Sequence, residues 1–124
     1  MGNDIEFVYR IQDVDGRGPW KSGVSRLWIE DKTPDEYEQL KPIFEEFPDL
    51  RERLRGCRFH IGVACESLNA LRLWITRSEW KALKRLGYRC YRIRQDKIIA
   101  RSDVQCVFES EKPLASHRKI VQLY

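Results

Sequence analysis

The chain has 124 residues, a length that fits one domain with one hydrophobic core. Apolar residues make up 42%, which is too many for a disordered chain, and no apolar run approaches the roughly 20 residues that a membrane span requires. The 23 basic and 19 acidic residues give a net charge of +4, and the basic excess is concentrated in one stretch.

The N-terminal residues indicate the compartment. The segment MGNDIEF has no basic residues followed by an apolar run, so it predicts no secretory signal. Gly2 follows Met1, but residue 6 is Glu6, where the myristoylation pattern needs Ser or Thr. We therefore expect a cytoplasmic protein with reduced thiols.

The four cysteines, Cys57, Cys65, Cys90 and Cys106, allow two interpretations. Cys57, His60 and Cys65 would supply zinc ligands, but the paired short spacing of zinc sites is absent. Buried thiols in strands are the better interpretation, and we expect no metal.

The first element predicted is a strand over residues 6–11, EFVYRI, which is rich in β-forming residues. Residues 13–23, DVDGRGPWKSG, contain glycines and a proline and predict a loop. Residues 24–30, VSRLWIE, alternate well enough for a second strand or an ordered return.

A helix start is predicted at residues 33–36, TPDE, which combine a Thr cap, a Pro at the first helical position and the Glu of a capping box. Apolar residues follow at helical spacing: Tyr37, Leu40, Ile43, Phe44 and Phe47. Pro42 removes a backbone donor within this pattern and predicts a kink or two short helices. Pro48 ends the segment, and residues 49–56, DLRERLRG, predict a further turn of helix.

The middle of the chain predicts a strand and two helices. Residues 57–64, CRFHIGVA, read as the strand. Ser67 can cap the first helix, whose apolar positions are Leu68, Leu71, Trp74 and Ile75. A capping box at residues 76–79, TRSE, opens the second helix, which ends at Gly87.

The remaining chain predicts a strand region that begins over residues 88–93, and further strands over residues 103–110 and 117–124. The order of elements predicts a single α+β domain over residues 1–124, with a mixed or antiparallel split sheet and three to four helices. The regular strand–helix alternation of a doubly wound fold is missing.

Arg10 lies within the first predicted strand, where an arginine usually points to solvent. If it points into a cleft instead, its planar guanidinium suits a phosphate or a carboxylate. Gly16 and Gly18 would then let the backbone approach a ligand, and Trp20 would stack on a flat ring.

Ser67 and Gln105 also have an ordinary and a functional interpretation. Ser67 is either a helix cap alone or a group near a bound ribose, above a pocket floor of the small residues Gly62 and Ala64. Gln105 is a polar residue at the start of an apolar strand, a common arrangement that says little by itself.

Together these segments resemble the ADP-ribosyltransferase superfamily, in its arginine–serine–glutamate branch. VYRI at residues 8–11 is similar to the first-strand tyrosine–arginine of that branch, and residues 59–75 are similar to its aromatic–glycine strand running through a serine into a helix. Residues 82–93 and 104–114 are similar to its late helix and closing strand. The chain also resembles small bacterial and phage proteins with a tyrosine–arginine strand, a Gly-Arg-Gly-Pro turn and a Gln-x-Val-Phe strand.

This resemblance implies an ADP-ribosyltransferase-like fold with an NAD-binding cleft between two small sheets. Arg10 would hold the dinucleotide phosphates, Ser67 would contact the nicotinamide ribose or support the catalytic residue, and Gln105 would occupy the acidic catalytic position. Trp20 and His60 would be pocket walls.

The residue at the acidic position departs from the family. A carboxylate stabilises the oxocarbenium-like state as nicotinamide leaves, whereas neutral Gln105 offers a hydrogen bond without charge. That loss corresponds to on the order of a hundredfold or more in rate. Glu109 lies about 13 Å farther along the strand and is a poor substitute, and Glu66 is the acid next to Ser67.

The basic stretch supports other hypotheses. Between Arg77 and Arg101, nine residues are Lys or Arg and two, Glu79 and Asp96, are acidic. The stretch is either a solvated face or a surface for nucleic acid or an acidic protein. Three functions therefore stay open: an NAD-dependent ADP-ribosyltransferase or NAD hydrolase, a binding module for protein or nucleic acid, and a phage-type accessory protein that inhibits or modifies a host factor.

Overall fold

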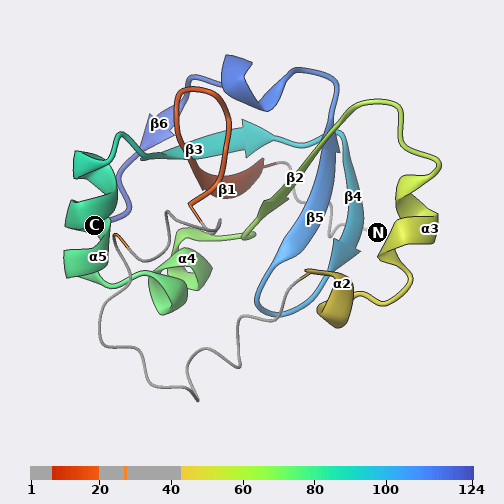
Figure 1. The fold of residues 1–124 in the computed structure, drawn as a ribbon, viewed down its shortest axis with the longest axis horizontal. Helices are drawn as coiled ribbons and strands as arrows, with labels where there is room; N and C mark the ends of the chain where they lie inside the picture. The colour runs from red at the N-terminus through yellow and green to blue at the C-terminus, as the bar shows by residue number, and fades with distance from the viewer. Residues whose placement is uncertain (1–6, 20–26, 28–42) are drawn as a thin grey trace.

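The computed structural model describes residues 7–19, 27 and 43–124, in which two three-stranded antiparallel sheets are combined with four α-helices (Figure 1). The elements in chain order are β1 (Phe7–Gln12), α2 (Ile43–Glu46), α3 (Leu50–Leu54), β2 (His60–Ala64), α4 (Leu68–Trp74), α5 (Arg77–Arg85), β3 (Arg89–Arg94), β4 (Lys97–Arg101), β5 (Cys106–Ser110), the 3-10 helix η2 (Leu114–Ser116) and β6 (Ile120–Val121). The predicted α+β class with split antiparallel sheets is confirmed.

The two sheets meet at one backbone junction. Their strand orders are β1-β3-β6 and β2-β5-β4, and all neighbouring strands are antiparallel. Tyr9 in β1 pairs with Cys65, just past the end of β2, through hydrogen bonds of 2.7 and 2.9 Å. This pairing joins the edge of one sheet to the edge of the other.

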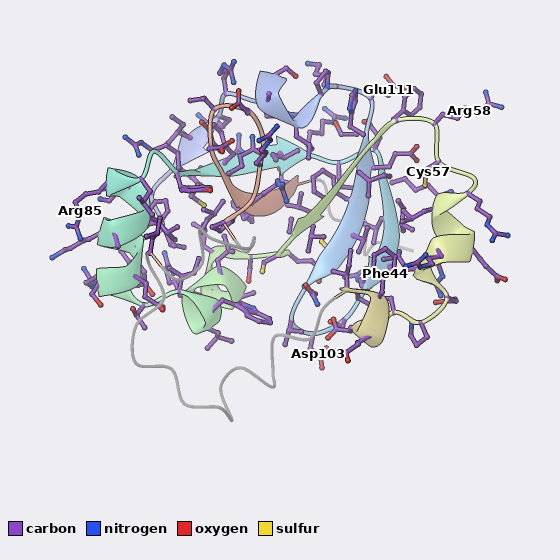
Figure 2. The ribbon with its side chains drawn as sticks, viewed as in Figure 1. Phe44, Cys57, Arg58, Arg85, Asp103 and Glu111 are labelled. Carbon is purple, nitrogen blue, oxygen red and sulfur yellow. The ribbon has the colours of Figure 1, made fainter. Side chains whose placement is uncertain are left out.

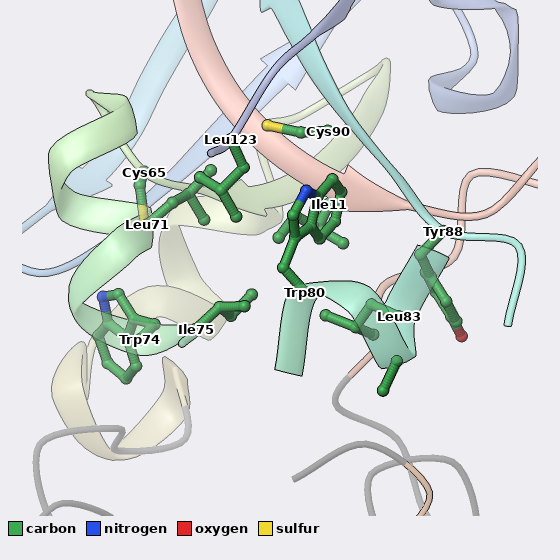
Figure 3. Packing of buried hydrophobic residues seen from close by; sticks show 11 residues of the cluster. Ile11, Cys65, Leu71, Trp74, Ile75, Trp80, Leu83, Tyr88, Cys90 and Leu123 are labelled. Atoms are coloured by element: carbon green, nitrogen blue, oxygen red, sulfur yellow. The ribbon is translucent and has the colours of Figure 1, made fainter. Parts of the chain in front are cut away.

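The alternation of side chains along β1 places its residues on two different packing layers. Val8 packs with Ile93 and Phe108 in a cluster between the two sheets. Ile11, on the opposite face of the strand, packs with Trp80 beneath α4 and α5 (Figure 3). Both faces of the first sheet are therefore covered by apolar contacts.

The second sheet is also covered on both sides. Val107 of β5 packs with Leu50 of α3 on the side away from the first sheet. All five residues of β5 are consequently buried. The layers run from α4 and α5 through the two sheets to α2 and α3 (Figure 1).

The helix boundaries follow local chemistry. The Thr76 hydroxyl accepts a hydrogen bond from the Glu79 N–H, and the Glu79 carboxylate accepts one from the Thr76 N–H. This capping box satisfies orphan donors at the start of α5. Gly87 follows the helix with a φ of 96°, a conformation that glycine adopts without a steric penalty. Both predicted features of α5 are confirmed.

The remaining sequence predictions have mixed outcomes. Strands near residues 6–11, 57–64 and 103–110 are confirmed as β1, β2 and β5. The predicted strand at residues 24–30, apart from residue 27, and the predicted helix start at residues 33–36 lie outside the described residues. The strand region that was predicted to begin at residue 88 comprises two strands, β3 and β4, and these strands belong to different sheets.

The thiols are mostly buried, as expected. Cys65, Cys90 and Cys106 lie in the apolar core and are free, while Cys57 is half-buried and lies before β2. In the described part of the chain, no helix has the length and apolar character needed to span a membrane.

Candidate functional site

Arg10 projects into the layer between the two sheets. It lies on the same face of β1 as Val8, and its register partner Tyr91 also belongs to the cluster between the sheets. Its Nη1 donates a hydrogen bond of 2.7 Å to the Val63 carbonyl oxygen of β2. The strand arginine therefore does not take the solvent-facing position that is usual for its residue type.

The remaining Arg10 contacts tie the first strand to its own turn. Nη2 donates to the Gly16 carbonyl oxygen at 3.0 Å, and Nε donates to Gln12 Oε1 at 3.0 Å. Burial lowers the pKa of Arg10 to about 10, and the nearby Asp13 carboxylate acts in the opposite direction. The guanidinium thus stays protonated at neutral pH while its hydrogen-bond acceptors in the described structure are uncharged.

The turn after β1 packs against η2. Gln12 Nε2 donates to the Leu114 carbonyl oxygen at 2.8 Å. Gly16 has a φ of 82°, and a Cβ placed on it would lie 2.8 Å from the backbone nitrogen of Ala115. A Cβ on Gly18 would lie 3.7 Å from Arg10 Nη2. The two glycines and Arg10 are therefore brought together, and the Gly16 backbone approaches protein closely.

Ser67 and Gln105 lie near the same sheet junction, in different local roles. Ser67 Oγ accepts a hydrogen bond of 3.1 Å from the Ala70 N–H, so the residue caps α4 as the ordinary interpretation predicts. Gln105 is buried immediately before β5, where its backbone carbonyl accepts from the Ser102 N–H at 2.9 Å. The register pairs Ala64 with Cys106, which places Gln105 beside the end of β2.

The other predicted site residues are scattered. His60 is exposed at the start of β2, at the end of the strand away from Cys65. Trp20 lies outside the described residues. Glu109 Oε2 accepts hydrogen bonds from the Arg58 and Phe59 N–H groups at 3.0 and 3.1 Å, which orders the segment before β2.

A second candidate site is the outer side of α5. Its inward residues Trp80, Ala82 and Leu83 are buried, and so is Glu79, whose side chain is 0% exposed and belongs to the capping box. The exposed charged positions of the helix are all basic. We call these residues together with the adjacent exposed Arg89 the α5 basic face: Arg77, Lys81, Lys84, Arg85 and Arg89.

Both ends of the α5 basic face are held by contacts. The Arg77 guanidinium lies 5.0 Å from the centre of the Tyr124 ring, a distance that allows a cation–π interaction. Arg89 Nη1 donates to the Lys84 and Tyr88 carbonyl oxygens at 3.1 and 2.7 Å, beside the C-terminal end of α5. Between these ends, Arg85 extends outward on the side of the molecule opposite Arg58 (Figure 2).

The basic residues of β4 at the end of the stretch, Lys97 and Arg101, lie elsewhere and are close to acids. β4 belongs to the second sheet, far from α5 in Figure 1. Arg101 Nη2 lies 2.7 Å from Glu66 Oε1, and Lys97 pairs in register with Glu109. Residues 77–101 therefore do not form one continuous basic surface, and α5 exposes no acid along its own length.

Sequence reasoning missed Gln12, which links Arg10 to the Leu114 backbone. A signal was present, because residues two apart in a strand share a face. A polar pair at positions 10 and 12 of an otherwise apolar strand indicates a buried hydrogen-bonded network as well as a ligand site.

Fold and sites together define a small α+β protein with two joined antiparallel sheets, a half-buried arginine between them and a cationic helix face. The chain belongs to the family described as Bacteriophage T4 Y00F protein, whose family model matches residues 1–120. Comparisons with the curated proteins and with the solved structures found no match. Membership agrees with the resemblance to small phage proteins, whereas the ADP-ribosyltransferase relationship stays a prediction.

Proposed function

We propose that this phage protein is a non-catalytic accessory protein that binds nucleic acid through the α5 basic face. The observation that carries the proposal is the separation of charge on α5. Its exposed charged residues are basic, while its acid, Glu79, is buried and engaged in the capping box. The face therefore presents positive charge with no acid of its own helix to offset it.

Nucleic acid fits this surface because it carries closely spaced phosphates. Cations that neutralise phosphates release condensed counterions, and this release drives sequence-independent binding. Exposed lysine and arginine side chains make such contacts without a preformed pocket. The cations of α5 point away from the apolar core, as on any solvated helix face, and are therefore available for such contacts.

A labelled mixed-sequence DNA in fluorescence anisotropy tests the proposal. The α5 variant replaces three cations of the face: Lys81→Gln, Lys84→Gln and Arg85→Gln. A matched control removes the same charge from exposed lysines elsewhere: Lys97→Gln, Lys112→Gln and Lys119→Gln. We expect the α5 variant to bind at least about tenfold more weakly than the control at low salt, because each lost phosphate contact removes counterion release. Equal affinities, or no binding by the wild type, would overturn the proposal.

A second candidate, NAD binding, is favoured by the position of Arg10. Its guanidinium is desolvated between the sheets and lies beside Gly18, where a bound phosphate would replace its present acceptors, the Val63 and Gly16 carbonyls. Gln105 lies beside the end of β2, at the same junction. Planar guanidinium groups suit phosphates. We propose this as the alternative function, in which Arg10 would hold the dinucleotide phosphates and Ser67 and Gln105 would lie toward the ribose.

Titration calorimetry with NAD tests the second candidate. A supporting result is binding at millimolar NAD or tighter that ADP-ribose reproduces and nicotinamide alone does not, because Arg10 would recognise the phosphates. No heat at millimolar NAD with correctly folded protein would end this candidate. A nicotinamide-release assay then separates binding from chemistry.

A further inference from the structure

We infer that the α5 basic face binds duplex DNA along its phosphate backbone, without a preference for base sequence. The inference rests on the proposed function and specifies its ligand. Three features of the surface lead to it: the spacing of the cations, the burial or contacts of the nearby aromatic rings, and the chemistry of the exposed side chains.

The cations form a row along the helix. Arg77, Lys81 and Arg85 are four residues apart, so successive members are offset by about 6 Å along the helix axis and lie on the same side. Lys84 lies beside this row, and Arg89 extends it beyond the end of α5. A row of positive charge that turns only gradually around the helix matches a line of phosphates better than it matches a single anion.

The aromatic side chains near this face are not free to stack on bases. Trp80 and Tyr88 are 5% and 3% exposed. The Tyr124 ring lies against the guanidinium groups of Arg72 and Arg77, at 5.9 and 5.0 Å from its centre, and its hydroxyl donates to the Ile75 carbonyl oxygen. Proteins that bind single strands rely on exposed aromatic platforms. Among the described residues, this face lacks an exposed aromatic side chain on which a base could stack. Duplex DNA needs no such side chain because its bases already stack on one another, so the face favours a duplex.

The exposed side chains of α5 are suited to phosphates. Ser78 is its exposed uncharged polar residue, and the helix has no Asn or Gln to pair with adenine. The lysine ammonium is a point charge, which suits a phosphate oxygen. Arg89 already donates from Nη1 to two backbone carbonyls. Lysine and arginine can also pair with guanine in the major groove, but their contacts to phosphate oxygens position a protein on DNA without reading its sequence.

Three labelled DNAs of about 16 residues per strand test the inference: two duplexes of unrelated sequence and one of their single strands. We expect the two duplexes to bind within about threefold of each other and the single strand to bind at least about tenfold more weakly. The Arg85→Gln substitution should weaken both duplexes by the same factor.

The outcomes separate this inference from the function on which it rests. A tenfold preference for the single strand, or for one duplex sequence, would overturn the inference and leave nucleic-acid binding intact. A loss in Arg85→Gln confined to one duplex would show base reading and overturn it as well. No binding to any of the three DNAs would overturn both.

Discussion

Arg10 Nη1 donates a hydrogen bond of 2.7 Å across the gap between the sheets to the Val63 carbonyl oxygen. The two strands are otherwise joined near this point by the Tyr9–Cys65 pairing. A charged side chain therefore reinforces the junction of two apolar layers. Its role in holding the fold is independent of any ligand.

Replacing Arg10 with methionine should destabilise the protein by about 2–4 kcal/mol. The substitution removes three hydrogen bonds and leaves the Val63 and Gly16 carbonyls and the Gln12 amide without that donor. Urea unfolding monitored by circular dichroism measures the change. The exposed Arg17→Met is the control and should cost less than about 0.5 kcal/mol. Equal effects of the two substitutions would contradict this role of Arg10.

The two left-handed glycines should respond differently to alanine. Both glycines have a positive φ, a conformation that costs an alanine about 1 kcal/mol. A Cβ on Gly87 would meet no other atom, so Gly87→Ala should lower the free energy of unfolding by about that amount. Gly16→Ala also brings its Cβ within 2.8 Å of the Ala115 nitrogen and should lose about 2–4 kcal/mol. Thermal unfolding of both variants decides the order, and a larger loss in Gly87→Ala would contradict the packing of the turn.

Ser67 should behave as a helix cap. Ser67→Ala should cost about 1 kcal/mol because the Ala70 N–H loses its acceptor, whereas Ser67→Asp should retain most of the stability. Chemical denaturation of the pair measures both effects. If Ser67→Asp is as unstable as Ser67→Ala, capping is not what the hydroxyl contributes.

The thiols should differ sharply in reactivity. Burial raises the pKa of Cys65, Cys90 and Cys106 to about 12, so about one thiol in ten thousand is ionised at pH 8. Brief treatment of the native protein with iodoacetamide should therefore label Cys57 alone, as read by mass spectrometry. Labelling in denaturant, the control, should reach all four cysteines. Rapid labelling of Cys90 in the native protein would contradict its burial.

Local chemistry was readable from the sequence where it depends on neighbours in the chain. The Thr76–Glu79 capping box, the Ser67 cap and Gly87 follow from fixed spacings of particular residue types, and the structure confirms them. Strands β1, β2 and β5 were likewise predicted from their β-forming residues.

The candidate sites depend on contacts between distant segments, which a single sequence does not encode at any fixed spacing. The direction of Arg10 is set by Val63, 53 residues away, and by the turn at Gly16. The basic stretch reads as continuous, yet the chain moves from one sheet to the other between β3 and β4. That change separates the α5 basic face from Arg101, which instead approaches Glu66.

The salt dependence of duplex binding tests the central claim most directly. If the five cations of the α5 basic face each contact a phosphate, the logarithm of the association constant should fall with the logarithm of salt concentration at a slope of about −4.5. The variant lacking Lys81, Lys84 and Arg85 should show a slope of about −2, while the matched control keeps the wild-type slope. A slope that is the same in the variant and the wild type would contradict the assignment of binding to this face.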